Sequence, residues 1–327
     1  TAIDLAWETG ARNAWGMDVH NRCATTIAAL KLARSLMADD PNIDTVLIAG
    51  GYAISHFIDL TDVNTSFLFN IGAGAGAMIV KRDWPENRVK GIHLIADGMM
   101  SRHVIVPASG TVQHPTDTRV ERGDFKFRLV EPEAMKTRLG EVSISNWLEC
   151  VDKALANSGD KPDGTPYTRA DIDFFNMSLV KPSAHREMLE HLGLAEEQSV
   201  YISDIGHIGE QDAIINIEAG LEQGRLKPGD TMAIIAAGIG YVWGGAIVDE
   251  FGHQVADFSA RLLATTRKPT ITVGQVAWLK VVATTAFGAY LDWGTAQQRR
   301  IAEAHPDLLQ GLGFAAGSMG PKIEAAC

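Results

Sequence analysis

One cysteine near the start of the chain has the surroundings of a nucleophile. Cys23 lies in the stretch GMDVHNRCATTIAALKLARSLM, residues 16–37, and the apolar residues that follow it at helical spacing are Ile27, Leu30, Ala33 and Met37. A cysteine in the first turn of a helix faces backbone N–H groups and the positive end of the helix dipole, which favour the nucleophilic thiolate. The alternative is an inert core cysteine, because free cysteine is among the most buried residue types.

The elements around Cys23 are expected to be short strands and one helix. A strand over Met17–Val19 leads into the cysteine, and a buried strand over Thr45–Ala49 follows the helix. Further along, Gly72, Gly74 and Gly76 alternate with alanines before an apolar strand over Met78–Val80. Glycines at alternate positions allow a second backbone to approach closely. They do not match a dinucleotide-binding fingerprint, because the spacing differs and no helix follows.

The rest of the chain predicts an α/β protein in which strands alternate with helices. The expected strands are residues 91–98, 171–180, 199–206, 232–236 and 242–248, and the expected helices are residues 131–158, 181–192 and 211–223. Such alternation is typical of a layered architecture with largely buried strands. Cys150 is expected in the core and His185 on the solvent side of its helix.

The composition indicates an ordinary globular protein. Of its 327 residues, 46% are hydrophobic and 21% charged, and the net charge of −11 argues against nucleic acid or an anionic membrane as a partner. No apolar run is long enough to predict a membrane span. Three cysteines form no disulfide framework, and nothing at the start resembles a signal peptide, so we expect a cytoplasmic protein. We expect no metal and no cofactor.

In order and spacing, these segments carry a resemblance to a known family. The strand–Cys–helix unit, GAGAGAMIV and RLKPGDTMAIIAAGIGYVWGGAIV together resemble the thiolase-fold family of ketoacyl-acyl-carrier-protein synthase III and its acyltransferase relatives, over about residues 5–250. The resemblance implies a five-layered α-β-α-β-α fold of two similar halves. It also implies an acyl-thioester substrate, carried by coenzyme A or an acyl-carrier protein, and a homodimer or a dimer with a related subunit.

The resemblance assigns site residues and shows a departure from the family. Family enzymes use a Cys, a His and an Asn; Cys23 matches the nucleophile, Ser178 stands at the His position and His207 at the Asn position. The ordinary decarboxylative condensation machinery is therefore not intact. We expect His207 to act as the base, Ser178 to orient His207 or the acceptor, and Asp204 to be a second candidate orienter. The backbone N–H groups of Cys23 and Ile239 are the expected oxyanion donors.

Three functions remain open at this stage. The first is an acyltransferase that forms an acyl-thioester on Cys23 and passes the acyl group to an acceptor. The second is a catalytically silent partner subunit of a heterodimeric condensing enzyme. The third is a carbon–carbon condensing synthase with an altered triad. The sequence leaves open the acyl chain length, the acceptor and whether transfer is to carbon, oxygen or nitrogen.

The expected domain organisation has three parts. Residues 1–122 form the first, Cys-bearing half, which lacks the start that family members have, and residues 123–250 form the second half. Residues 251–327 either supply the missing start, through a circular permutation or through the numbering, or form an unrelated appendage. A strand around Ser66–Asn70 and the glycine run after it are expected at the dimer edge.

Overall fold

The computed structural model describes residues 1–252 apart from 109 and 112, together with residues 261–262, 280–285 and 288–292. The chain divides into two units, Thr1–Ala264 and Thr265–Cys327. In the second unit, β10 (Lys280–Thr285) and β11 (Gly288–Asp292) form an antiparallel hairpin. The first unit holds every candidate site residue.

A four-stranded sheet forms the centre of the first unit, in the order β3-β8-β7-β6. The strands are β3 (Arg88–Ala96), β6 (Phe174–Met177), β7 (Met232–Gly238) and β8 (Val242–Asp249). β3, β8 and β7 are antiparallel neighbours, whereas β6 runs parallel to β7. Nearly all residues of β6, β7 and β8 are buried, as expected for strands covered on both faces.

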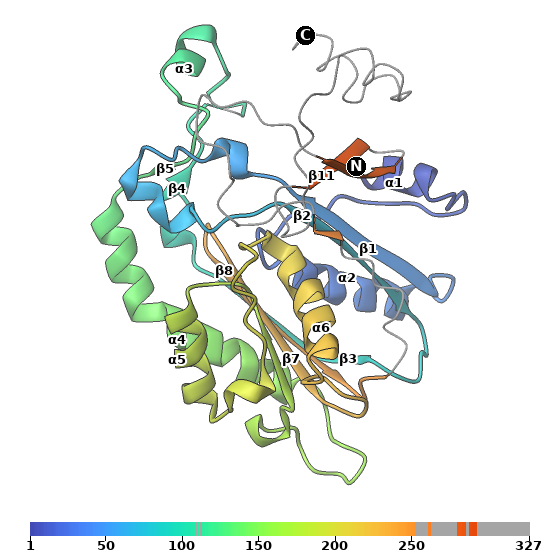
Figure 1. Cartoon of the computed structure of the whole chain (residues 1–327). Coiled ribbons are helices and arrows are strands. Elements are labelled where there is room, and N and C mark those ends of the chain that lie inside the picture. The colour runs from blue at the N-terminus through green and yellow to red at the C-terminus, as the bar shows by residue number, and fades with distance from the viewer. Residues whose placement is uncertain (109, 112, 253–260, 263–279, 286–287, 293–327) are drawn as a thin grey trace. The chain divides into compact units, whose positions relative to one another are not determined.

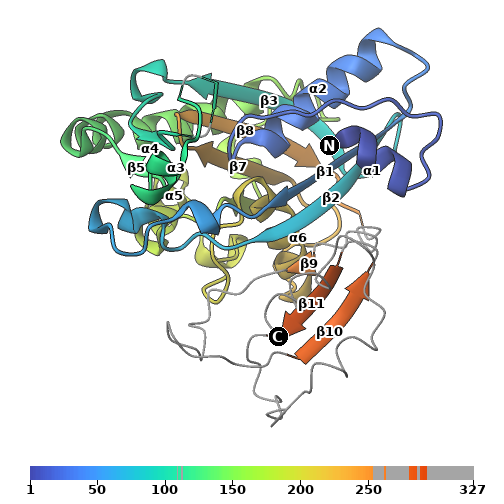
Figure 2. The same cartoon turned by 90° about the horizontal axis from the view of Figure 1, so that it is seen from above.

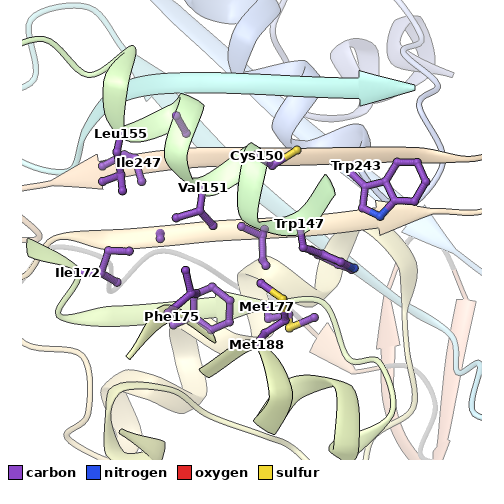
Figure 3. Packing of buried hydrophobic residues seen from close by; sticks show 14 of the residues in the cluster. Trp147, Cys150, Val151, Leu155, Ile172, Phe175, Met177, Met188, Trp243 and Ile247 are labelled. Atoms are coloured by element: carbon purple, nitrogen blue, oxygen red, sulfur yellow. The ribbon is translucent and has the colours of Figure 1, made fainter. Parts of the chain in front are cut away.

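The two faces of this sheet carry separate apolar clusters, because successive side chains of a strand point to opposite faces. Ala233, Ile235, Trp243 and Ile247 lie in the cluster that includes α4 (Pro132–Ala156) and α5 (Pro182–Leu192). Figure 3 shows Cys150 and Val151 of α4 packed over these strands, and Cys150 is fully buried, as predicted. The even-numbered residues of β7 and β8, such as Ile234 and Ala246, belong to the cluster on the other face of the sheet.

A second, smaller sheet lies beyond that other face. β1 (Thr45–Tyr52) pairs antiparallel with β2 (Gly74–Lys81), and β9 (Arg261–Leu262) adds two residues to the edge of β2. α2 (Thr25–Asp39) and α6 (Asp212–Glu222) lie between the two sheets, as Figure 1 shows. Figure 2 shows the β1–β2 pair and the β3–β8–β7 strands as separate sheets from above. The predicted apolar face of α2 is confirmed, since Ile27, Leu30, Ala33 and Met37 are buried.

The layered α/β arrangement predicted from the sequence is present in the described residues. The described residues supply four of the five layers: the β1–β2 sheet, the α2 and α6 layer, the larger sheet, and the α4 and α5 layer. The outer face of the β1–β2 sheet is open in the described part, because the paired residues Leu47 and Ile79 are 43% and 64% exposed.

Short elements complete the described part of the first unit. They are α1 (Ala2–Glu8), η1 (Ser55–Phe57), η2 (Val63–Leu68), η3 (Gly98–Met100), β4 (Val104–Ile105), α3 (Asp117–Glu121), β5 (Arg128–Leu129), η4 (Arg169–Asp171), η5 (Glu196–Gln198) and η6 (Gly209–Gln211). None of the helices in the described ranges is long and apolar enough to cross a membrane.

Four local predictions differ from the structure. Residues 17–19 form no strand, and residues 199–206 contribute only one bridge, between Phe175 and Ser199. The segment expected as a dimer-edge strand forms the 3₁₀ helix η2 instead. His185, expected toward solvent, is buried between the rings of Phe175 and Tyr201 and contacts the Ser199 hydroxyl at 2.8 Å.

The predicted division of the chain into halves and an extra segment is only partly within the described residues. β3 precedes residue 123 and yet pairs with β8 in the larger sheet. Of residues 251–327, β9 joins β2, and β10 and β11 pair with each other. Residues 293–327 lie outside the described residues, so the role predicted for residues 251–327 stays a prediction.

Candidate active site

Cys23 lies in a tight turn directly before α2. Ala24 is the N-cap residue, so Cys23 precedes the first helical turn in which it was expected. The Thr25 hydroxyl accepts from the backbone N–H of Asn21 at 2.8 Å and donates to the carbonyl of Arg22. Arg22 has φ 54°, in the left-handed region that non-glycine residues rarely adopt. The turn holds Cys23 largely buried, with 7% of its surface exposed.

His207 is positioned by backbone pairing with the segment before β2. Its N–H donates to the carbonyl of Asn70 at 2.8 Å, and its carbonyl accepts from the N–H of Gly72 at 2.8 Å. The alternating glycines make room for side chains, not for a second backbone as predicted, because a Cβ at Gly74 would lie 3.0 Å from the Ile208 side chain and one at Gly76 would lie 2.7 Å from the Gln211 side chain. The glycines therefore admit the loop that carries the histidine.

The structure brings Cys23 and His207 into contact and adds a third residue. His207 Nε2 lies 3.1 Å from Cys23 Sγ, and His207 Nδ1 lies 2.6 Å from Asp212 Oδ2. Asp212 is 1% exposed and accepts from the backbone N–H groups of Leu179 at 2.7 Å and Ile208 at 2.8 Å. These two amide donors fix the carboxylate, and the carboxylate in turn fixes the imidazole ring.

Ser178 does not take the position predicted for it. Its buried hydroxyl faces the carbonyl of Ile235 at 3.5 Å, and the far side of the His207 ring is occupied by Asp212. The reason is geometric: Ser178 follows directly after β6, where its backbone N–H also bonds to Ile235. Asp204, the second candidate orienter, is exposed. Sequence reasoning missed Asp212, because an aspartate that opens a helix is ordinarily explained by the helix dipole.

The charges around His207 favour its protonated form. Burial alone would lower the pKa of the ring, but the Asp212 carboxylate and the Cys23 sulfur outweigh burial and raise the pKa well above 6.5. A protonated ring donates to the sulfur and stabilises the thiolate, which is the nucleophilic form of cysteine. Burial also raises the pKa of the neighbouring Glu210.

A largely apolar cavity of about 280 Å³ opens onto the Cys23–His207 pair. Its walls come from α4, α5, the ends of β7 and β8 and the segment before β2, and include Phe67, Leu139, Trp147, Met188, Tyr241 and Trp243. Figure 3 shows Trp147, Met177, Met188 and Trp243 at the end of the apolar cluster away from Leu155 and Ile172. A cavity of about 150 Å³ accommodates benzene, so this one has room for a larger apolar group.

The bend between β7 and β8 lies against the Cys23 turn. A Cβ at Gly238 would lie 2.5 Å from Arg22 Cβ and 2.7 Å from the Cys23 backbone nitrogen, so only glycine permits this contact. The next residue, Ile239, lines the cavity. Ile239 and Cys23, the two residues expected to supply oxyanion donors, are thus brought to the same region. Within the described residues, no group of three or more His, Cys, Asp or Glu side chains could hold a metal.

Comparison with known proteins identifies the family. Residues 17–98 match the model for 3-oxoacyl-[acyl-carrier-protein] synthase III, and residues 163–250 match the model for the C-terminal part of the same family. The chain is 28% identical over 255 residues to the β-ketoacyl-[acyl-carrier-protein] synthase III of Syntrophomonas wolfei, covering 76% of this chain and 70% of the relative. It is 30% identical over 239 residues to the synthase III of Campylobacter curvus, covering 72% and 66%.

Solved structures show the same fold. The 3-oxoacyl-(acyl carrier protein) synthase III of Pseudomonas aeruginosa superposes with a TM-score of 0.62 at 20% identity, over 77% of this chain and 72% of that one. The fold is therefore the thiolase-like fold predicted from the sequence. The chain belongs to the 3-oxoacyl-[acyl-carrier-protein] synthase III family and is an enzyme of this class.

Proposed function

We propose that this protein transfers an acyl group through a thioester on Cys23. The observation that carries the proposal is the continuous chain of contacts from Cys23 through His207 to Asp212. A nucleophile, a base within hydrogen-bond reach and a group that orients the base are the three parts that nucleophilic catalysis requires. The adjoining apolar cavity supplies room for the acyl chain.

The proposed reaction has two steps that share the proton of His207. In the first, the Cys23 thiolate attacks the thioester carbonyl, a new C–S bond forms, and the carrier thiolate leaves and takes the proton from His207 Nε2. In the second, the acceptor attacks the Cys23 thioester and gives its proton to His207 as the sulfur leaves as a thiolate. Asp212 keeps Nδ1 protonated and stabilises the charged ring in both steps. Backbone N–H groups of Cys23 and Ile239 are the proposed donors to the tetrahedral oxyanion.

The residues at the two family positions after Cys23 favour an acceptor with a removable proton on a heteroatom. Ser178 stands where the resemblance places a histidine, and His207 stands where it places an asparagine. The His and Asn that the resemblance assigns to the malonyl carbonyl are therefore replaced by Ser178 and His207, of which only His207 can act as a base. A base next to the acyl-enzyme suits deprotonation of a hydroxyl or amine.

A second candidate function is carbon–carbon condensation. It is supported by the printed names of the relatives, which are β-ketoacyl-[acyl-carrier-protein] synthases III. The silent-partner function has less support, because a subunit without chemistry needs no oriented Cys–His–Asp arrangement.

Mass spectrometry of the intact enzyme tests the proposed acyl-enzyme. The protein is incubated with a series of acyl-CoA and acyl-carrier-protein thioesters, and the Cys23 peptide is then examined for the acyl mass. We expect labelling of the wild type and of Cys150→Ala, whose thiol is buried in the core, and none of Cys23→Ala. Labelling that persists in a folded Cys23→Ala variant, or its absence from the wild type with every donor, would overturn the proposal.

The isolated acyl-enzyme then distinguishes the two acceptor classes. It is offered a malonyl thioester in one arm, and small alcohols and amines in the other. Release of CO2 with a ketoacyl product supports condensation, whereas loss of the acyl label to an ester or amide supports transfer to oxygen or nitrogen.

A further inference from the structure

A tyrosine beside Cys23 and His207 has no part in the chemistry described so far. Tyr52 is the last residue of β1 and pairs with Gly74 of β2. Burial alternates along β1, so that Tyr52 lies on the same, inner face of the strand as Gly50. That face meets the loop that carries His207, because a Cβ at Gly50 would lie 2.4 Å from Gln211 Nε2. Tyr52 lines the cavity together with Cys23 and His207.

The Tyr52 ring is fitted to this loop. A Cβ at Gly209 would lie 2.3 Å from Tyr52 Cδ2, and Gly209 also has φ 67°, so glycine is required there on both counts. The Tyr52 and His207 rings are in edge-to-face contact, with 5.8 Å between their centroids and 60° between their planes. Tyr52 is thus held by contacts to the same loop that presents the imidazole and Asp212.

The surroundings keep the Tyr52 phenol neutral. Burial raises its pKa most, and the negative charges of Cys23, Glu210 and Asp212 raise it further. The Cys23 sulfur lines the same cavity as the phenol and is close enough for its charge to contribute to the raised pKa of Tyr52. A neutral phenol O–H next to a thiolate can only donate, and hydrogen bonds to a charged acceptor are stronger than those between neutral groups.

We propose that Tyr52 is a further residue of the Cys23 site and that its O–H donates a hydrogen bond to the sulfur alongside His207 Nε2. The inference rests on the proposed function in one respect, that Cys23 is the nucleophile. With two donors, the thiolate is stabilised before substrate arrives. When the sulfur is acylated it loses its negative charge and becomes a weak acceptor, so the O–H is released into the cavity that holds the acyl group.

Alkylation of Cys23 by iodoacetamide as a function of pH tests the role of Tyr52. Tyr52→Phe keeps the ring over Gly209 and removes only the O–H. We expect alkylation of the Cys23 peptide at pH 7 to slow about tenfold, with equal rates for variant and wild type at high pH where every thiol is ionised. The matched control is Tyr201→Phe, which removes a phenol that donates to the Val180 carbonyl at 2.8 Å and does not line the cavity. It should leave the pH curve unchanged.

Two further readouts keep the test decisive. The buried Cys150 peptide reports folding, since it stays unlabelled while the core is intact. Incorporation of 3-fluorotyrosine at position 52 makes the phenol a stronger donor of the same shape and is expected to speed alkylation at pH 7. An unchanged pH curve for folded Tyr52→Phe, or a slowing that is equal at all pH values, would overturn the proposal.

The experiment separates this inference from the proposed function because alkylation needs no acyl donor. If the wild type forms no acyl-enzyme, the proposed function fails and the alkylation curves still decide the role of Tyr52. If the acyl-enzyme forms and Tyr52→Phe alkylates as the wild type does, only the inference about Tyr52 fails.

Discussion

At residue 207, an imidazole stands where the resemblance to the synthase III family assigns an amide. An amide can only hold a substrate carbonyl, whereas an imidazole can also carry a proton to and from the reacting atoms. The change is accompanied by a buried carboxylate, Asp212, which accepts from two backbone N–H groups and contacts His207 Nδ1. The substitution at 207 and the carboxylate at 212 therefore form one functional unit.

Replacing Asp212 by asparagine should slow acyl-enzyme formation. Asp212→Asn removes the charge that raises the pKa of His207 and allows the ring to adopt the other tautomer. We expect single-turnover acylation of Cys23 to slow by about 10²–10⁴-fold. Ser178→Ala is the matched control, because the Ser178 hydroxyl makes only a 3.5 Å contact with Ile235 and should change the rate by less than about threefold. Equal effects of the two variants would contradict the assignment.

The same pair should make stability depend on pH. The pKa of His207 is higher in the folded than in the unfolded protein, so the folded state binds this proton more tightly. The stabilisation is complete below about pH 6.5 and is lost as the pH rises through the folded pKa. The free energy of unfolding of wild type minus that of Asp212→Asn, measured in urea, should therefore decrease between pH 6 and pH 9. A difference that grows over this range would show that the ring is not held protonated.

The sequence predicts two of the three residues of this unit. Cys23 is indicated by its place before an amphipathic helix, and His207 by its position in the order of family segments. Asp212 and Tyr52 lack such an indication, because their roles depend on where a loop and the end of β1 meet in space. Ser178 occupies the expected place in the chain, but its side chain is turned to Ile235 by the end of β6. The side-chain contacts around a site are set by packing that single-sequence patterns do not contain.

At the scale of the elements, glycines decide how closely the functional segments meet. The alternating glycines of β2 admit the His207 loop, and Gly238 admits the Cys23 turn against the bend between β7 and β8. These are contacts between segments distant in sequence that carry residues of one site. A side chain at such a position changes the geometry of the site before it disturbs the sheet.

Gly238→Ala is expected to damage activity more than stability. The added Cβ would lie 2.5 Å from Arg22 Cβ and push the Cys23 turn away from Ile239. We expect acylation to slow by about 10²-fold or more, since a misplacement of about 1 Å can have that effect. Gly98→Ala is the control, because a Cβ there has nothing within 4 Å. Thermal unfolding and acylation are measured on both; an active Gly238→Ala enzyme would argue against the oxyanion role of this bend.

The cavity wall provides a test of where the acyl chain lies. Met188 and Met100 are both fully buried in the same apolar cluster, but only Met188 lines the cavity. Met188→Ala and Met100→Ala should each lower the free energy of unfolding by about 2–5 kcal/mol. Only Met188→Ala should shift the preferred acyl donor toward longer or bulkier chains, measured by competition between thioesters for Cys23. A shift in both variants, or in neither, would place the acyl chain elsewhere.

Helices were predicted more closely than strands, and the reason is physical. The long helix expected at residues 131–158 is α4 (Pro132–Ala156), since helical periodicity is local to one segment. Residues 17–19 and 199–206 have strand-like composition but lack a ladder in the described part of the chain. A strand exists only when a partner runs beside it, and single-sequence patterns say nothing of the partner.

At the scale of the whole molecule, the sequence order predicts a layered α/β fold, and the described residues form sheets and helices that fit it. The sequence pattern does not predict that β3 pairs with β8. Through this pairing, a strand of the predicted first half, residues 1–122, belongs to the larger sheet. The outer face of the β1–β2 sheet is open in the described structure, where Leu47 and Ile79 are exposed.

Oligomeric state is the last property that the sequence predicts and experiment can decide. The resemblance places a dimer edge near residues 66–70, and the structure has exposed large apolar side chains close by, at Leu60 (74%), Val63 (77%) and Phe69 (41%). Exposed apolar side chains contribute to interaction surfaces when they lie together, and an obligate dimer typically buries more than about 2,000 Å². We therefore expect light scattering to show a dimer at micromolar concentration.

The variants that test the dimer place a charge within this surface. Leu60→Asp and Val63→Asp together put two carboxylates where an apolar partner surface would lie, and burying them unpaired would cost several kcal/mol. We expect the double variant to be monomeric and to have a lower thermal midpoint than the wild type, because it loses the stabilisation that association provides. Ile3→Asp, on α1 and 72% exposed, is the matched control and should remain dimeric. A monomeric wild type would contradict the dimer, and a dimeric double variant would move the interface away from residues 60–69.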